Sequence, residues 1–167
     1  MTHVSGPGPR WRSTSEAEHA LLAAAREDVV SACTHFATST SAVLVTVEVD
    51  GRVDVLGVDA SGADDADVDR VRLLHAGRQG GRLFVFSGCC SLIGSMTVGE
   101  LRDVSAVDEV VMIGHRELVP DDQVIDTQGH VRPELEDGVV RLVVRPAVGG
   151  LVIPFEQAAP TPCCADH

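Results

Sequence analysis

The stretch Ala42-Val43-Leu44-Val45-Thr46-Val47-Glu48-Val49-Asp50-Gly51 decides which class of fold the chain is expected to adopt. Its first eight residues are rich in β-branched side chains, which favour extended backbone. Asp50-Gly51 is typical of a two-residue hairpin turn. Residues 52–59 follow with valines that partly alternate, so the whole stretch predicts a β-hairpin.

A helix is expected on each side of this hairpin, because apolar residues there repeat with helical spacing. Upstream, Ser13 and Glu16 stand three residues apart, as in a capping box. The apolar positions that follow keep a helical period: Leu21, Leu22, Ala25, Val29, Cys33 and Phe36. They predict a helix over residues 13–36 with Cys33 on its apolar face. Downstream, residues 68–76 predict a second, shorter helix that ends before Gly77.

The rest of the chain favours strands punctuated by glycine and proline. These strands are expected at residues 82–87, 108–115, 123–126, 139–145 and 151–155. Helices early and strands late predict an α+β fold, with two helices in the N-terminal half packed on a mostly antiparallel sheet.

The length of 167 residues favours one domain. We expect a flexible arm at residues 1–12, a single α+β domain at 13–157, and a cysteine-containing tail at 158–167 that folds back on the domain.

The charge and hydropathy of the chain argue against nucleic acids and membranes as its partners. The net charge is −12 and all 13 cations are arginines, so the chain repels nucleic-acid phosphates and anionic membranes. No apolar run approaches the roughly 20 residues that span a bilayer. We therefore expect a cytoplasmic protein with no nucleic-acid or membrane partner, which leaves a partner enzyme or a second copy of the chain. Its cysteines are expected to stay reduced.

Four of the five cysteines form two dipeptides, Cys89-Cys90 and Cys163-Cys164. The first pair follows an apolar strand and Gly88, and the second lies in a proline-rich tail that ends in His167. Cysteine and histidine are the usual protein ligands of zinc, iron and copper. Neighbouring side chains of an extended segment point opposite ways, so one thiol of each pair is expected to face a shared site.

The sequence thus predicts a small metal-binding protein, either an enzyme or a carrier. The expected ligands are Cys89, Cys90, Cys163, Cys164, His167 and His115. The expected cofactor is iron, as a cluster or a single ion, and then zinc or copper. Cys33 is expected in the core instead, since free cysteine is among the most buried residue types. Two alternatives stay open: a metal-free thiol enzyme or redox protein that uses Cys89 or Cys90, and a non-catalytic accessory protein of a larger enzyme.

Residues 81–156 resemble an uncharacterised bacterial family of small proteins, often encoded beside aldehyde or alcohol dehydrogenases. Ser87 to Cys90 match the Ser-Gly-Cys-Cys motif that follows an apolar strand in that family. Met96 and the segment Val143 to Phe155 match two further features of the family. That family usually has a further cysteine where this chain has Thr97. The resemblance therefore implies that the two tail cysteines supply the missing ligand.

A second resemblance is to A-type iron–sulfur carriers. These are small β-rich proteins with one Gly-Cys loop after a strand and two cysteines near the C-terminus. Gly88-Cys89 and Cys163-Cys164 match that layout, although the carriers separate their terminal cysteines by a glycine. This likeness implies an iron–sulfur cluster held by the loop and the tail together.

Overall fold

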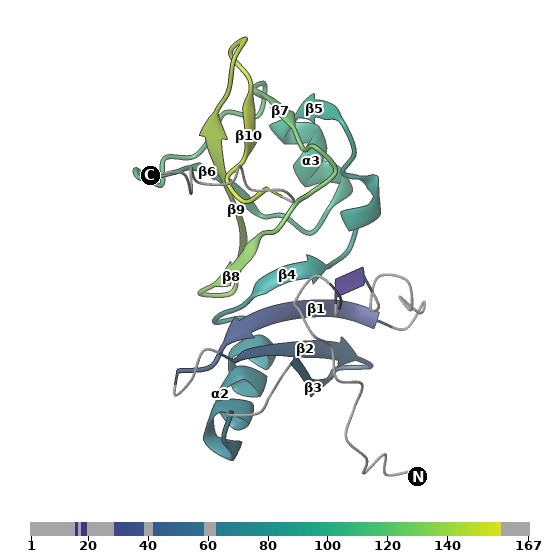
Figure 1. The fold of residues 1–167 in the computed structure, drawn as a ribbon. Coiled ribbons are helices and arrows are strands. Elements are labelled where there is room, and N and C mark those ends of the chain that lie inside the picture. The colour runs from purple at the N-terminus through teal and green to yellow at the C-terminus, as the bar shows by residue number, and fades with distance from the viewer. Residues whose placement is uncertain (1–15, 17, 20–28, 39–41, 59–62, 158–167) are drawn as a thin grey trace. The chain divides into compact units, whose positions relative to one another are not determined.

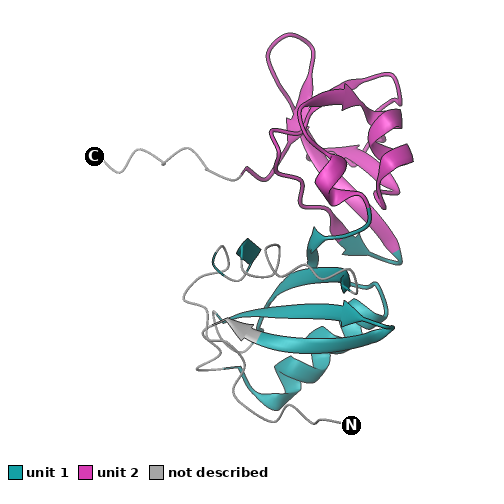
Figure 2. Cartoon of the chain, turned by 90° about the vertical axis from the view of Figure 1, so that its right-hand side faces the viewer, with its two compact units in different colours: residues 1–87, 135–138 teal, residues 88–134, 139–167 magenta. Residues whose placement is uncertain are grey.

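The computed structural model describes residues 16, 18–19, 29–38, 42–58 and 63–157 (Figure 1). It divides the chain into two compact units, coloured separately in Figure 2. The first unit runs to Ser87 and includes Leu135–Gly138, and the second holds Gly88–Glu134 and the chain from Val139 onward. The single domain expected over 13–157 stays a prediction. The expected arm and tail lie outside the described residues.

The first unit is an antiparallel sheet with one helix against it (Figure 1). Its elements are β1 (Val29–Phe36), β2 (Val43–Val49), β3 (Arg52–Val58), α2 (Asp65–Ala76), β4 (Arg82–Val85) and most of β8 (Glu134–Glu136). The strand order is β3-β2-β1-β4-β8. Helix α2 packs against β2 and β3.

The β2–β3 hairpin confirms the prediction made from the opening stretch. Val49 pairs with Arg52, which leaves Asp50 and Gly51 as a two-residue loop. Their φ angles are +49° and +71°, the positive pair that a type I′ turn requires. The hairpin brings β2 into the middle of the sheet, where it also pairs with β1.

The helix expected over residues 13–36 is wrong in its C-terminal part, because Val29–Phe36 forms strand β1. Residues 16, 18 and 19 are helical, and Ser13 lies outside the described residues. The strand pairs with β2 at one edge and β4 at the other, and its successive residues Ala32 and Cys33, which face opposite sides of the sheet, are both buried. A strand covered on both faces loses its two-residue alternation of apolar positions, and a short run then fits a helical period equally well.

The two faces of the first sheet differ in chemistry. One face carries an apolar cluster formed by Ala32, Val45, Val47, Phe84 and Val85. Alternation along β1 and β2 places Cys33, His35 and Thr46 on the other face, which α2 covers. The polar groups of this buried face belong to the site described below.

The second unit is built from short strands and one helix. Its elements are β5 (Ser95–Thr97), α3 (Val98–Val104), β6 (Glu109–Met112), β7 (Val124–Asp126), β9 (Val139–Pro146) and β10 (Val152–Pro154). The strand order is β9-β10-β7-β5, and β6 pairs with β9. The β6–β9 and β10–β7 pairings are parallel, and the others in this unit are antiparallel.

The expected α+β class with a mostly antiparallel sheet is confirmed, whereas the expected placement of both helices in the N-terminal half is not confirmed. Helix α3 lies in the C-terminal half and was not expected. Thr97 and Glu100 form its capping box, in which Thr97 N–H donates to Glu100 Oε2 at 2.7 Å and Glu100 N–H donates to Thr97 Oγ1 at 3.2 Å. No helix within the described ranges is long and apolar enough to cross a membrane.

Replacing Thr97 with alanine tests how strongly this cap stabilises the second unit. Thr97→Ala removes the acceptor for the Glu100 N–H, and we expect a loss of about 0.5–2 kcal/mol in the free energy of unfolding. Urea denaturation followed by circular dichroism measures the change. Thr97→Ser keeps the hydroxyl and should stay close to the parent; an equal loss in both variants would show that the hydroxyl is not the cause.

Candidate metal centre

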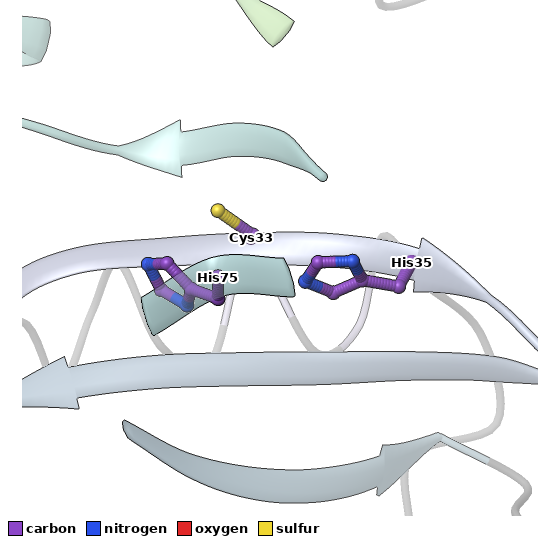
Figure 3. Close-up of side chains that lie close together, drawn as sticks. All are labelled: Cys33, His35 and His75. Carbon is purple, nitrogen blue, oxygen red and sulfur yellow. The ribbon is translucent and has the colours of Figure 1, made fainter. Parts of the chain in front are cut away.

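Three potential metal ligands converge inside the first unit. Cys33 and His35 lie two residues apart on β1 and face the same side, and His75 comes from the last turn of α2 (Figure 3). Their ligand atoms, one sulfur and two ring nitrogens, all lie within 4.8 Å of one another. The exposed fractions of the three residues are 0%, 5% and 3%, so the group is closed to solvent.

Helix α2 is tied to the end of β1, and this positions His75. The Asp64 side chain caps the helix by accepting from the Asp67 backbone N–H at 2.8 Å. Asp67 is buried, and its Oδ1 accepts from the Thr38 backbone N–H at 3.0 Å and from the Thr38 hydroxyl at 2.9 Å. The first turn of the helix is therefore held where β1 ends, and the helix places His75 over the polar face of the strand.

The hydroxyl of Thr46 lies between the two histidine rings. Its Oγ1 is 2.9 Å from His35 Nε2 and 2.7 Å from His75 Nδ1. On the other side of the second ring, His75 Nε2 is 2.8 Å from Ser31 Oγ, and the Ser31 hydroxyl donates to Glu48 Oε2 at 2.8 Å. A continuous hydrogen-bonded path thus joins the buried His35 to the half-buried carboxylate of Glu48.

One assignment of protons satisfies every bond in this path. Because the Ser31 hydroxyl gives its proton to Glu48, the Nε2–H of His75 donates to Ser31 Oγ. Nδ1 of His75 then accepts from the Thr46 hydroxyl, and Thr46 Oγ1 accepts from the Nε2–H of His35. Both imidazoles are neutral in this arrangement.

Burial sets the charge state of the three ligands. The pKa of His35 is lowered to about 4, first by burial and then by repulsion from His75 and Arg70. Burial also lowers the pKa of His75, against a smaller opposite effect of Glu48. Burial raises the pKa of the Cys33 thiol well above its usual range. At neutral pH the group therefore consists of two neutral rings and one thiol.

Gly81 forms a wall of the site that a larger residue would fill. Its φ angle is +115°, a conformation that other residues rarely adopt. A Cβ atom at this position would lie 2.5 Å from Cε1 of His35 and 3.0 Å from Cβ of Cys33. The backbone before β4 therefore approaches the two β1 ligands closely only because residue 81 is glycine.

The donor set suits a single ion more than a cluster. Neutral imidazole and thiolate are ligands of zinc and copper, whereas iron–sulfur clusters usually use four cysteines. A tetrahedral ion with Zn–N bonds near 2.0–2.1 Å and a Zn–S bond near 2.3 Å separates these ligand atoms by about 3.3–3.6 Å. The widest separation here, at most 4.8 Å, would therefore close by up to roughly 1.2–1.5 Å. The Thr46 hydroxyl would give up its two ring contacts or become a fourth ligand.

The ligands expected from the sequence lie elsewhere. Cys89 is half-buried and Cys90 is exposed, in a turn of the second unit, and His115 is exposed in the turn after β6. Cys163, Cys164 and His167 lie outside the described residues. Across the described ranges, no group of three candidate metal ligands includes any of these cysteines or His115. Their role as ligands stays a prediction.

The burial of Cys33 was expected from the sequence, but its position beside His35 and His75 was not. It is buried, as its residue type suggested, but it lies on a strand and not on a helix. The sequence pattern that could have revealed the group is Cys33-Thr34-His35, because a Cys-x-His triplet on a strand turns both ligands to one face. Nothing in the sequence marks His75 as their partner.

Comparisons with known proteins add no independent information about this group. No protein-family model, no curated protein and no solved structure matches the chain. The resemblances drawn from the Ser-Gly-Cys-Cys stretch and from the A-type layout stay predictions. The geometry of Cys33, His35 and His75 alone supports a metal centre here.

The buried histidines predict how the stability of the metal-free protein depends on pH. The pKa of His35 is about 4 in the folded chain against 6.5 in the unfolded chain, so between these values the unfolded chain binds more protons. The free energy of unfolding should therefore be highest above about pH 6.5. It should fall by on the order of 3 kcal/mol as the pH drops toward 4. The lowered pKa of His75 acts in the same direction.

Urea unfolding of metal-free protein at a series of pH values measures this loss. The variant His35→Gln removes one of the two titrating rings, and its stability should change less steeply over the same pH range. An identical slope in the variant and the parent would show that His35 does not titrate as its burial implies.

Gly81→Ala tests the close approach of the backbone to the ligands. The new methyl group would meet the His35 ring and would also force alanine into a left-handed conformation. We expect a loss of about 1–3 kcal/mol, measured by thermal denaturation. Gly80→Ala is the matched control, because a Cβ there meets only Leu74 at 3.6–3.7 Å. Equal effects of the two substitutions would contradict this account of Gly81.

Proposed function

We propose that this protein binds one transition-metal ion through Cys33, His35 and His75, and that the ion is zinc. The observation that carries the proposal is the convergence of three ligand atoms within 4.8 Å in a part of the first unit closed to solvent. Two ligands come from one strand and the third from a helix, so the ion would link β1 to α2.

The donor set favours zinc over the iron expected from the sequence. One thiolate and two imidazoles match the ligand types of four-coordinate zinc sites. The Thr46 hydroxyl, which already contacts both rings, is the oxygen nearest to a fourth position. Copper shares the preference for two histidines and one cysteine and is the second choice. Either ion requires the Cys33 thiol to lose its proton, which a bound cation brings about.

Burial favours a structural role over a catalytic one. A catalytic metal keeps one coordination position open to water or substrate, whereas structural zinc sites are closed. The three ligands are at most 5% exposed and Thr46 is 0% exposed. The ion would therefore stabilise the packing of α2 on the sheet, and its binding free energy would add to the stability of the fold.

A variant with a single cysteine tests the proposal directly. Replacing Cys89, Cys90, Cys163 and Cys164 with serine leaves Cys33 as the one thiol of the chain. The variant is refolded with one equivalent of Co²⁺, which replaces zinc and absorbs visible light. We expect one ion per chain, with the visible bands of tetrahedral cobalt and a thiolate-to-cobalt charge-transfer band in the near ultraviolet.

Further substitutions in this background identify the ligands. Cys33→Ser should abolish the charge-transfer band, and His75→Asn should abolish tetrahedral binding. His115→Asn removes an exposed histidine outside the group and should leave the spectrum unchanged. Circular dichroism confirms that each variant folds. A folded single-cysteine variant that binds no Co²⁺, or a spectrum that survives Cys33→Ser, would refute the proposal and favour the metal-free alternatives.

A further inference from the structure

The second unit presents two thiols side by side on its surface. Cys89 and Cys90 begin a 3₁₀ turn, Cys89–Ser91, and their Sγ atoms are 3.8 Å apart. Both are free, and Cys90 is exposed. We propose that this pair is an exposed two-thiolate site for a tetrahedral zinc-group ion, independent of the buried group in the first unit.

The separation of the two sulfurs matches the geometry of such an ion. Two thiolates bound to one tetrahedral zinc at about 2.3 Å lie about 3.8 Å apart, because the S–Zn–S angle is near 109°. The thiols of Cys89 and Cys90 already stand at this distance. The pair could therefore take up an ion without a change in the backbone.

The turn, and not an extended segment, brings the thiols together. Extended backbone would have pointed the two side chains opposite ways, which is why the sequence predicted separate partners for them. In the structure the Ser91 N–H donates to the carbonyl of Gly88 at 2.9 Å and closes the turn. The expectation that the two thiols of this pair diverge is therefore wrong.

Neighbouring residues hold the turn rigid on both sides. Before it, Gly88 has a φ angle of +79°, and a Cβ there would collide with the backbone of Val104 and Ser105. After it, Leu92 is 2% exposed, and its carbonyl accepts from the buried Thr127 hydroxyl at 3.0 Å. A pair held in its binding geometry loses little conformational entropy when the ion arrives.

A disulfide between the two cysteines is the less favourable use of the pair. The Cα atoms of neighbouring residues lie about 3.8 Å apart, below the 4.4–6.8 Å that disulfides usually span. Two adjacent thiolates also repel each other, and an ion bound to both would neutralise that repulsion.

Exposure gives this site a different chemistry from the buried one. Two protein thiolates leave two positions of a tetrahedral ion for other ligands, such as water, a small thiol or a donor from another protein. An ion held in this way exchanges readily, so the pair suits the capture and transfer of zinc-group ions. The expected contribution of Cys163 and Cys164 would fill the same positions and stays a prediction.

Cadmium titration tests the pair without any change to the core. The parent for the test is Cys163→Ser/Cys164→Ser, in which Cys89 and Cys90 are the two thiols outside the core. We expect one Cd²⁺ bound at the pair, seen as thiolate-to-cadmium absorption in the ultraviolet and as one added ion in native mass spectrometry. Either Cys89→Ser or Cys90→Ser should weaken this binding by roughly tenfold or more, since one of two Cd–S bonds is lost.

Two further variants make the test decisive. Gly88→Ala keeps both thiols but distorts the turn, so it should weaken Cd²⁺ binding, whereas Ser91→Ala changes an exposed hydroxyl and should not. Cadmium binding that survives Cys89→Ser/Cys90→Ser unchanged would overturn the proposal. A parent that binds no Cd²⁺, or one that loses 2 Da by forming a disulfide in air, would overturn it too. Cadmium at the buried group of Cys33, His35 and His75 would persist in Cys89→Ser/Cys90→Ser, so the ion that this double substitution removes is the one assigned to the pair.

Discussion

The hydroxyl of Thr46 is the contact on which the buried polar face of the first unit depends. Burying a polar group without a hydrogen bond costs several kcal/mol, and this face buries two histidines and a threonine between a sheet and a helix. Thr46 bonds to His35 and His75 at once, because β2 pairs with β1 and lies under α2. The path through Ser31 then ends at Glu48, a carboxylate with partial access to water. The helix can therefore dock on polar groups without leaving their ring nitrogens unsatisfied.

Much of the fold follows from local patterns in the sequence. The Asp50-Gly51 turn requires two positive φ angles and fixes the β2–β3 register by itself. The strand at 29–36 could not be predicted in the same way, because its neighbours β2 and β4 decide its conformation. Its Val29, Cys33 and Phe36 fit a helical period as well as a strand. Helix α3 did carry a visible pattern, the capping box from Thr97 to Glu100, but its seven residues are too few for a helical period to stand out.

The candidate site was harder to predict than the fold, for a physical reason. Cysteine is usually buried as a small apolar residue, so burial alone could not mark Cys33 as a ligand. Its partners become visible only when β1 is known to be a strand, which turns Cys33 and His35 to one face, and when α2 is known to cover that face. The cysteine dipeptides are conspicuous in the sequence, but the sequence alone does not show how their thiols are arranged. In the structure, the two thiols of Cys89 and Cys90 lie in one turn with their Sγ atoms 3.8 Å apart.

Charge balance explains how the buried group could hold an ion in a region closed to water. A zinc ion with one thiolate and two neutral rings carries a net charge of about +1, and an isolated charge is costly in the core. Glu48 lies close enough for its charge to favour the protonated forms of both Cys33 and His75. That same negative charge would stabilise a cation, and Ser31 links it to the ring of His75. Because the rings are already neutral near pH 7, only the Cys33 thiol must release a proton when the ion binds. To bind the ion, the network of the metal-free protein must release that proton, move the Thr46 hydroxyl and draw the ligand atoms closer together.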